Sequence, residues 1–147
     1  MYSRQVAFNT ITDFKDMFPL MDFHPYGSAF INNKGKDIDI ACYSLREEVR
    51  AKFQSDVRIL GFKEENENYG EDMSFMSLRK GEINLILFFD SASYKEAIAA
   101  SNLCFLLAGR GQIPKRVRVL IHQVVRDPYR DILQLAREIK EEIGNAE

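Results

Sequence analysis

The sequence predicts an α+β fold with a small, mixed but mostly antiparallel sheet and a helical carboxy-terminal part. Residues 37–40, Asp-Ile-Asp-Ile, alternate charge with apolar side chains, which indicates a strand with one buried face. Two apolar-rich runs at 72–79 and 82–90 flank Lys-Gly, the pattern of a β-hairpin. From residue 93 onward the apolar residues recur at helical spacing.

Length and composition indicate a single domain. The chain has 147 residues, of which 46% are hydrophobic and 29% charged, as is ordinary for one soluble globular unit. We expect one domain over 1–147, with a sheet core and flanking helices over 1–92 and a helical extension over 93–147. A formal net charge of -2 gives no overall electrostatic reason to coat nucleic acid.

In the first part of the chain the pattern predicts helix, strand, strand and helix. Asn9 or Thr10 would cap a helix that ends before Pro19. Residues 21–31 indicate a strand and turn around a glycine, and 36–42 a second strand after the turn residues 32–35. Apolar residues every four positions, Leu45, Val49 and Phe53, predict an amphipathic helix over 44–56.

The later elements follow in the same way. We expect a short strand at 57–62, a polar loop at 63–71 and then the hairpin. Helices are predicted over 93–108, over 115–126 and from Asp127 or Pro128 to residue 143, where proline suits a first helical turn.

The two acidic residues of the second strand, Asp37 and Asp39, are the most informative pair in the chain. On a strand they would share one face with Cα atoms about 6.5 Å apart. That spacing suits carboxylates converging on a divalent cation, or on two cations about 4 Å apart. The pair therefore predicts a metal site.

Residues 25–28, Pro-Tyr-Gly-Ser, together with 36–40, Lys-Asp-Ile-Asp-Ile, resemble the signature of the nucleotidyltransferase superfamily, the DNA polymerase beta-like fold. The resemblance implies a sheet of the nucleotidyltransferase type. It implies that Gly27 and Ser28 bind nucleotide phosphates, and that Asp37 and Asp39 are catalytic ligands of Mg²⁺ or Mn²⁺. The implied substrates are a nucleoside triphosphate and an acceptor, which could be a protein, an RNA or a small molecule.

The third acidic position of that family pattern is where the sequence departs from it. The family's strand residue is an aspartate, and here the triplet is Ile83-Asn84-Leu85. Asn84 can ligate a cation through its oxygen, but it is neutral and cannot act as a general base. Glu82 has the same strand parity, so a register shift could substitute it.

Segment 77–86 also resembles small stand-alone nucleotidyltransferase-like proteins of bacteriophages, in which asparagine is frequent at this third position. The amino terminus has no apolar run long enough for a signal peptide, and no stretch approaches the ~20 apolar residues of a membrane span. We expect a cytoplasmic protein, in the host cytoplasm if phage-encoded. Cys42 and Cys104 lie in apolar stretches and are expected to be reduced core residues.

Two functions of different classes stay open. The first is a metal-dependent enzyme that transfers a nucleotidyl group from a nucleoside triphosphate. The alternative is a catalytically weak or inactive nucleotidyltransferase-like module that binds nucleotides or a protein partner, and Asn84 is its main support. A structural domain with a coincidental motif is a third interpretation. Motifs of serine hydrolases, P-loop kinases and zinc proteases are absent from the sequence.

Basic residues near these motifs have two interpretations. Arg79 and Lys80 at the hairpin, and Lys34 and Lys36 beside the acidic pair, could meet phosphates, but we interpret them as solvated turn residues. A basic helix face presents Lys115, Arg118, His122 and Arg126. We interpret that face as an exposed helix surface, with binding of triphosphate or a nucleic-acid backbone as the alternative.

Overall fold

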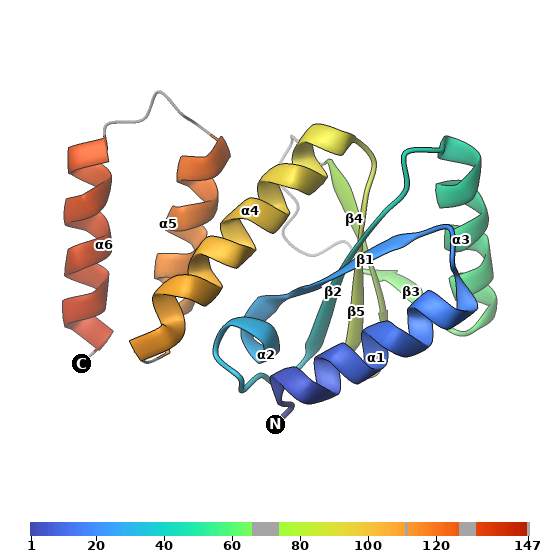
Figure 1. Cartoon of the computed structure of the whole chain (residues 1–147), viewed down its shortest axis with the longest axis horizontal. Coiled ribbons are helices and arrows are strands. Elements are labelled where there is room, and N and C mark those ends of the chain that lie inside the picture. The colour runs from blue at the N-terminus through green and yellow to red at the C-terminus, as the bar shows by residue number, and fades with distance from the viewer. Residues whose placement is uncertain (66–73, 111, 127–131, 147) are drawn as a thin grey trace.

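A computed structural model describes residues 1–65, 74–110, 112–126 and 132–146. In these ranges five strands form one mixed sheet in the order β1-β2-β5-β4-β3 (Figure 1). The strands are β1 (Asp22–Tyr26), β2 (Ile38–Tyr43), β3 (Lys63–Glu65), β4 (Phe75–Lys80) and β5 (Ile83–Phe88). β2 and β5 run parallel and the other three pairs are antiparallel, so the predicted α+β class and mostly antiparallel sheet are confirmed.

Helices cover both faces of the sheet, and two further helices pack beyond one of the covering helices. The helices are α1 (Arg4–Met17), α2 (Gly27–Ile31), α3 (Glu47–Ile59), α4 (Ser91–Leu107), α5 (Lys115–Arg126) and α6 (Ile132–Ala146), with a 3₁₀ turn at Ala108–Arg110. α1 and α3 pack against one face and α4 against the other. α5 and α6 stand side by side beyond α4 (Figure 1).

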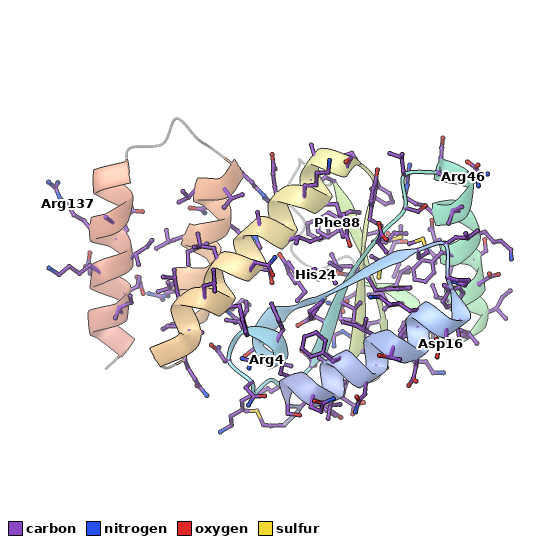
Figure 2. All side chains as sticks on the ribbon, viewed as in Figure 1. Arg4, Asp16, His24, Arg46, Phe88 and Arg137 are labelled. Carbon is purple, nitrogen blue, oxygen red and sulfur yellow. The ribbon has the colours of Figure 1, made fainter. Side chains whose placement is uncertain are left out.

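Strand alternation divides the side chains of the sheet between two cores. Ile38, Ile40 and Cys42 of β2 are buried against α1 and α3. Ala41 and Tyr43, with the opposite parity, pack with α4, and Figure 2 shows Phe88 between α4 and the strands. Because parity alternates, the side chain of Asp39 belongs to the α4 face.

A third cluster holds α5 beside the glycine that opens α2. Phe30 and Ile31 of α2 pack with Cys104 of α4 and with Val117 and Ile121 of α5. This cluster fixes the position of α5 relative to the loop that follows β1. Both cysteines are free and buried, as expected.

The first helix begins earlier than predicted. Ser3, and not Asn9 or Thr10, is the N-cap, and its Oγ accepts a hydrogen bond from the Val6 amide at 3.3 Å. Thr10 lies inside the helix, where its hydroxyl donates to the Val6 carbonyl at 2.8 Å. The helix ends before Pro19, as predicted.

Three further boundaries differ from the sequence prediction. Residues 27–31 form α2 and not a strand and turn, and α3 continues through the predicted strand 57–62 to Ile59. The chain then reverses at Gly61, whose φ is 105°, and β3 forms at the start of the predicted loop by pairing with β4. Leu45 is 79% exposed, so the predicted apolar stripe of α3 does not include it.

The carboxy-terminal helices agree with the prediction where they are described. α5 has the predicted bounds, and α4 begins two residues early, at Ser91. The predicted start of the last helix at Asp127 or Pro128 lies outside the described residues. Within the described parts of the chain, no helix is both long and apolar enough to cross a bilayer.

Candidate functional site

Three polar side chains form a row across neighbouring strands on the α4 face. Asp39 of β2 is in register with Asn84 of β5, and Asn84 is in register with Arg79 of β4. The side-chain amide Nδ2 of Asn84 donates to Asp39 Oδ1 at 3.0 Å. The family pattern's third position therefore lies beside the acidic motif, as the sequence predicted, but carries an amide.

The Asp39 carboxyl has a raised pKa. Burial is the main cause, and the nearby charge of Asp37 raises this pKa further. The hydrogen bond from Asn84 works in the opposite direction, because it stabilises the ionised carboxylate. Asp39 is thus a partly buried carboxylate with raised proton affinity.

Asp37 lies outside the strand, so its predicted place on a strand face is wrong. β2 begins at Ile38, whose amide donates to the Glu82 carbonyl at 2.8 Å. Just before this point, Gly35 pairs with Tyr2 in an isolated antiparallel bridge. Asp37 still reaches the site, since it lines the same pocket as Asp39.

Arg79 occupies a place that the sequence prediction missed. It lies within β4 and not in the hairpin turn. Its Nη1 is 3.2 Å from Asp37 Oδ1, and its Nε donates to Glu65 Oε2 at 2.6 Å. Its register position opposite Asn84 was the available signal, because it places Arg79 in the row with Asp39.

Gly27 allows the backbone to approach the carboxylate of Asp39. Its φ is +70°, a conformation that glycine adopts without steric cost. A Cβ atom at this position would collide with the side chain of Asp39, lying only 2.9 Å from its Cγ. The glycine is therefore required both for the turn into α2 and for the space next to Asp39.

Ser28 lines the pocket but is also used within the loop. Its hydroxyl donates to the Lys34 carbonyl at 2.8 Å, and Asn32 Nδ2 lies 3.5 Å from the Ser28 hydroxyl oxygen. Ser28 therefore closes the loop between α2 and β2 in this structure.

A pocket of about 880 Å³ brings the acidic motif together with the basic helix face. Gly27, Ser28, Asp37 and Asp39 line one side of it, and α5 lines the other. The contributing α5 residues are Lys115, Arg118, Val119, His122, Gln123 and Arg126. The basic face is therefore part of a pocket wall and not a plain exposed surface. The sequence alone predicted the basic face of α5, but not that this face lies across the pocket from the acidic motif.

His122 and Tyr26 link the two sides of this pocket. The Tyr26 hydroxyl is 3.3 Å from His122 Nε2 and 3.4 Å from Nδ1, and the two rings meet edge to face. Burial, together with the charges of Arg126 and Arg118, lowers the pKa of His122 to about 4. His122 is therefore neutral at neutral pH.

The donor set fits one divalent cation. Asp37 and Asp39 offer carboxylate oxygens in one pocket, and Asn84 Oδ1 is buried without a hydrogen-bond partner among the described residues. Carboxylate and amide oxygens are suitable ligands for Mg²⁺ or Mn²⁺. Across the described ranges, no three His, Cys, Asp or Glu side chains gather as a metal cluster. Glu82 is exposed in the hairpin turn and does not line the pocket.

Comparison with solved structures places this arrangement among known folds. No protein-family model and no curated protein matches the chain. Cid1 poly(U) polymerase bound to MgATP has 13% identity and a TM-score of 0.47, with 82% of this chain and 39% of that chain covered. Conserved protein GrpB from Enterococcus faecalis has 15% identity and a TM-score of 0.55, with 97% of this chain and 93% of that chain covered.

The chain has the same overall fold as GrpB. At these identities the likeness concerns the fold alone, and the chain spans less than half the length of the Cid1 chains that it matches. In this fold Gly27 opens α2 directly after β1, Asp39 lies on β2 and Asn84 lies on β5. Arg79 and the α5 cations are features of this chain that the motif did not include.

Proposed function

We propose that the chain binds a nucleoside triphosphate with a divalent cation in the pocket between β2 and α5, and transfers its nucleotidyl group to an acceptor. One observation carries the proposal: a single pocket has the acidic motif on one side and a cationic helix face on the other. Such a pocket suits a ligand that brings a cation and a polyphosphate together.

The charges of the pocket support a polyanionic ligand. Among its described lining residues, five lysines and arginines stand against two aspartates, which leaves an excess of three positive charges. The whole chain, in contrast, has a formal net charge of -2. The five cations are Lys34, Lys36, Lys115, Arg118 and Arg126. The positive charge is thus concentrated where phosphates would bind, as charge complementarity requires.

The chain's own residues would divide the work of the transfer. Asp37 and Asp39, with Asn84 beside them, would hold a divalent cation, which when bound supplies charge neutralisation for the phosphates. Arg118 and Lys115 would hold the β- and γ-phosphates on the α5 side. Gly27 leaves room for the ligand next to Asp39, and Ser28 would contact phosphate only by releasing the Lys34 carbonyl.

In the reaction, an acceptor hydroxyl oxygen forms a bond to the α-phosphorus and the bond to pyrophosphate breaks. The hydroxyl proton needs a base. Asn84 cannot accept it, so Asp37, Asp39 or solvent must. The raised pKa of Asp39 makes its ionised carboxylate a stronger base than an ordinary aspartate.

A binding module without transfer activity is the second candidate, and two observations favour it. The amide of Asn84 adds no negative charge, and Asp37 is already paired with Arg79 at 3.2 Å. A site with less negative charge holds a cation less tightly and accelerates transfer less. Such a protein would retain the nucleotide but release no pyrophosphate.

Calorimetric titration of ATP and GTP with and without Mg²⁺ tests the proposal. We expect Mg²⁺-dependent binding that weakens about tenfold or more in Asp37→Ala/Asp39→Ala. The matched control is Asp13→Ala/Asp16→Ala, which removes two exposed carboxylates that do not line the pocket. Both lie on α1, which packs on the face of the sheet opposite α4, and Figure 2 labels Asp16 on this helix. Equal binding by both double variants contradicts the proposal. Pyrophosphate release with an acceptor separates the enzyme from the binding module.

A further inference from the structure

The charge of the side chains changes sign along the row Asp39, Asn84 and Arg79. Reading across the sheet, an anionic, a neutral and a cationic side chain stand on β2, β5 and β4 in direct register. Side chains that are opposite each other on neighbouring strands have Cβ atoms about 5 Å apart. A guanidinium is thus built into the sheet two strands away from the acidic motif.

Two carboxylates hold this guanidinium in place. Its Nε edge donates to Glu65 on β3, and its Nη1 faces Asp37 at the entrance to β2. Glu65 is itself fixed by pairing of β3 with β4, where it lies opposite Ser77. The Arg79 side chain is only 30% exposed. Arg79 is therefore a positioned cation and not a freely moving surface side chain.

This contact changes the electrostatics of the acidic motif. The three carboxylates Asp37, Asp39 and Glu65 and the guanidinium of Arg79 sum to a formal charge of -2, and without Arg79 the same group would carry -3. A divalent cation at Asp37 would meet the guanidinium already bound there, at a distance where like charges repel. An ion that binds through Asp37 Oδ1 therefore competes with Arg79 for this oxygen.

We propose that Arg79 is a built-in cation that competes with a divalent ion for Asp37 and so weakens metal binding at the acidic motif. The inference rests on the proposed function, because it concerns the metal site of that function. Asp39, which is hydrogen-bonded to Asn84 and has no ion pair with Arg79 among the described contacts, is the carboxylate that remains available to the ion. Glu65 holds the Nε edge of Arg79 independently of Asp37.

Titration of the full chain with Mn²⁺ alone, followed by the electron paramagnetic resonance signal of the free ion, tests this competition. We expect Arg79→Gln and Arg79→Met to bind Mn²⁺ about tenfold more tightly than the wild type, since the ion pair is partly exposed and screened. Arg79→Lys keeps the positive charge and should stay near the wild-type affinity. Two substitutions are used so that a folding defect in one does not end the test.

Two controls show whether an increase in Mn²⁺ affinity arises at the acidic motif. Arg58→Gln removes the same charge and breaks a similar ion pair, but the partner of Arg58 is Glu64 at 3.4 Å and not Asp37. It should leave Mn²⁺ affinity within about twofold of the wild type. In Asp37→Asn/Arg79→Gln the gain should vanish, because the carboxylate that Arg79 released is gone.

The outcomes separate this inference from the function on which it rests. Wild-type affinity in Arg79→Gln and Arg79→Met, with Mn²⁺ binding that depends on Asp39, overturns the competition and leaves the metal site in place. An equal gain in Arg58→Gln also overturns it, since net charge alone would then explain the effect. Failure of every variant to bind Mn²⁺ overturns both proposals.

Discussion

Asn84 donates its side-chain amide to the carboxylate of Asp39 at 3.0 Å, across the parallel pair β2 and β5. The contact stabilises the ionised carboxylate, since this hydrogen bond lowers a pKa that burial raises. It also leaves Asn84 Oδ1 buried with no hydrogen-bond partner in the described part of the chain. The amide thus supports the carboxylate without adding charge of its own.

Asn84→Asp should increase the metal affinity of the site. A third carboxylate would stand between Asp39 and Arg79 and supply the charge that the amide lacks. We expect Mn²⁺ to bind about tenfold more tightly, which at saturation adds about 1.4 kcal/mol to the stabilisation by the ion. Urea unfolding at pH 7 with and without Mn²⁺ measures it. In the control Asn84→Ala, the ion should stabilise no more than in the wild type; a similar increase in both variants would refute the charge argument.

Gly27→Ala should cost more stability than Gly81→Ala. Both glycines have positive φ, +70° and +58°, so alanine at either position carries a similar backbone cost of about 1 kcal/mol. Nothing lies within 4 Å of a Cβ at Gly81, whereas at Gly27 the Cβ collides with Asp39. We expect a further loss of roughly 1–3 kcal/mol at Gly27, as for overpacking. Urea unfolding of the two variants tests this, and equal losses would show that the collision relaxes freely.

Arg118→Ala should weaken nucleotide binding, and Arg116→Ala should not. Arg118 lines the pocket, and its Nε is buried without a hydrogen-bond partner among the residues that the structure describes. Arg116, two positions earlier on α5, is outside this pocket and faces Glu142 at 3.8 Å, with 82% of its side chain exposed. We expect about tenfold weaker ATP binding for the first variant, in line with one lost charge-assisted contact. Calorimetry at two salt concentrations measures it, and equal losses would place the phosphates elsewhere.

The stability of the chain should fall with acidity in a window set by His122. Its folded pKa of about 4 lies below the ordinary value of 6.5, so the unfolded chain binds the proton more readily. Above pH 6.5 His122 is neutral in both states and costs no stability. As the pH falls toward 4, the unfolded state gains the proton first, and the free energy of unfolding falls by at most about 3 kcal/mol. Glutamine in His122→Gln does not titrate in this range, so the difference in unfolding free energy between wild type and variant should change across pH 4–6.5. A constant difference would contradict the lowered pKa.

The local elements were largely predictable because each has its own periodicity. α5 has the predicted bounds, since its apolar residues are buried on one face and the basic ones lie on another. The start of α1 was not predicted because Ser3 is its N-cap, and the apolar periodicity does not indicate a helix start there. The place of Asn84 beside Asp39 was expected only from the family resemblance, because no local pattern predicts the parallel pairing of β2 with β5. That the chain forms a single domain stays a prediction.

The tertiary relationships of the site were not predictable in the same way. Sequence identified a basic helix face but not that α5 turns it toward Asp39, because packing of α5 on α2 and α4 decides that direction. Arg79 next to a hairpin turn was interpreted as solvated, and its ion pair with Asp37 depends on three strands being in register. The bridge between Tyr2 and Gly35, two residues before Asp37, is equally nonlocal.

The parallel pairing of β2 with β5 also bears on the order in which the chain folds. Asp39 and Asn84 are 45 positions apart, so α3, β3 and β4 lie within the loop that their contact closes. Closing such a loop is entropically costly and slow relative to local helix formation. On a nascent chain, the acidic motif would be synthesised well before the arginine and asparagine that restrain it. We therefore expect the site to be assembled late, after the hairpin has docked.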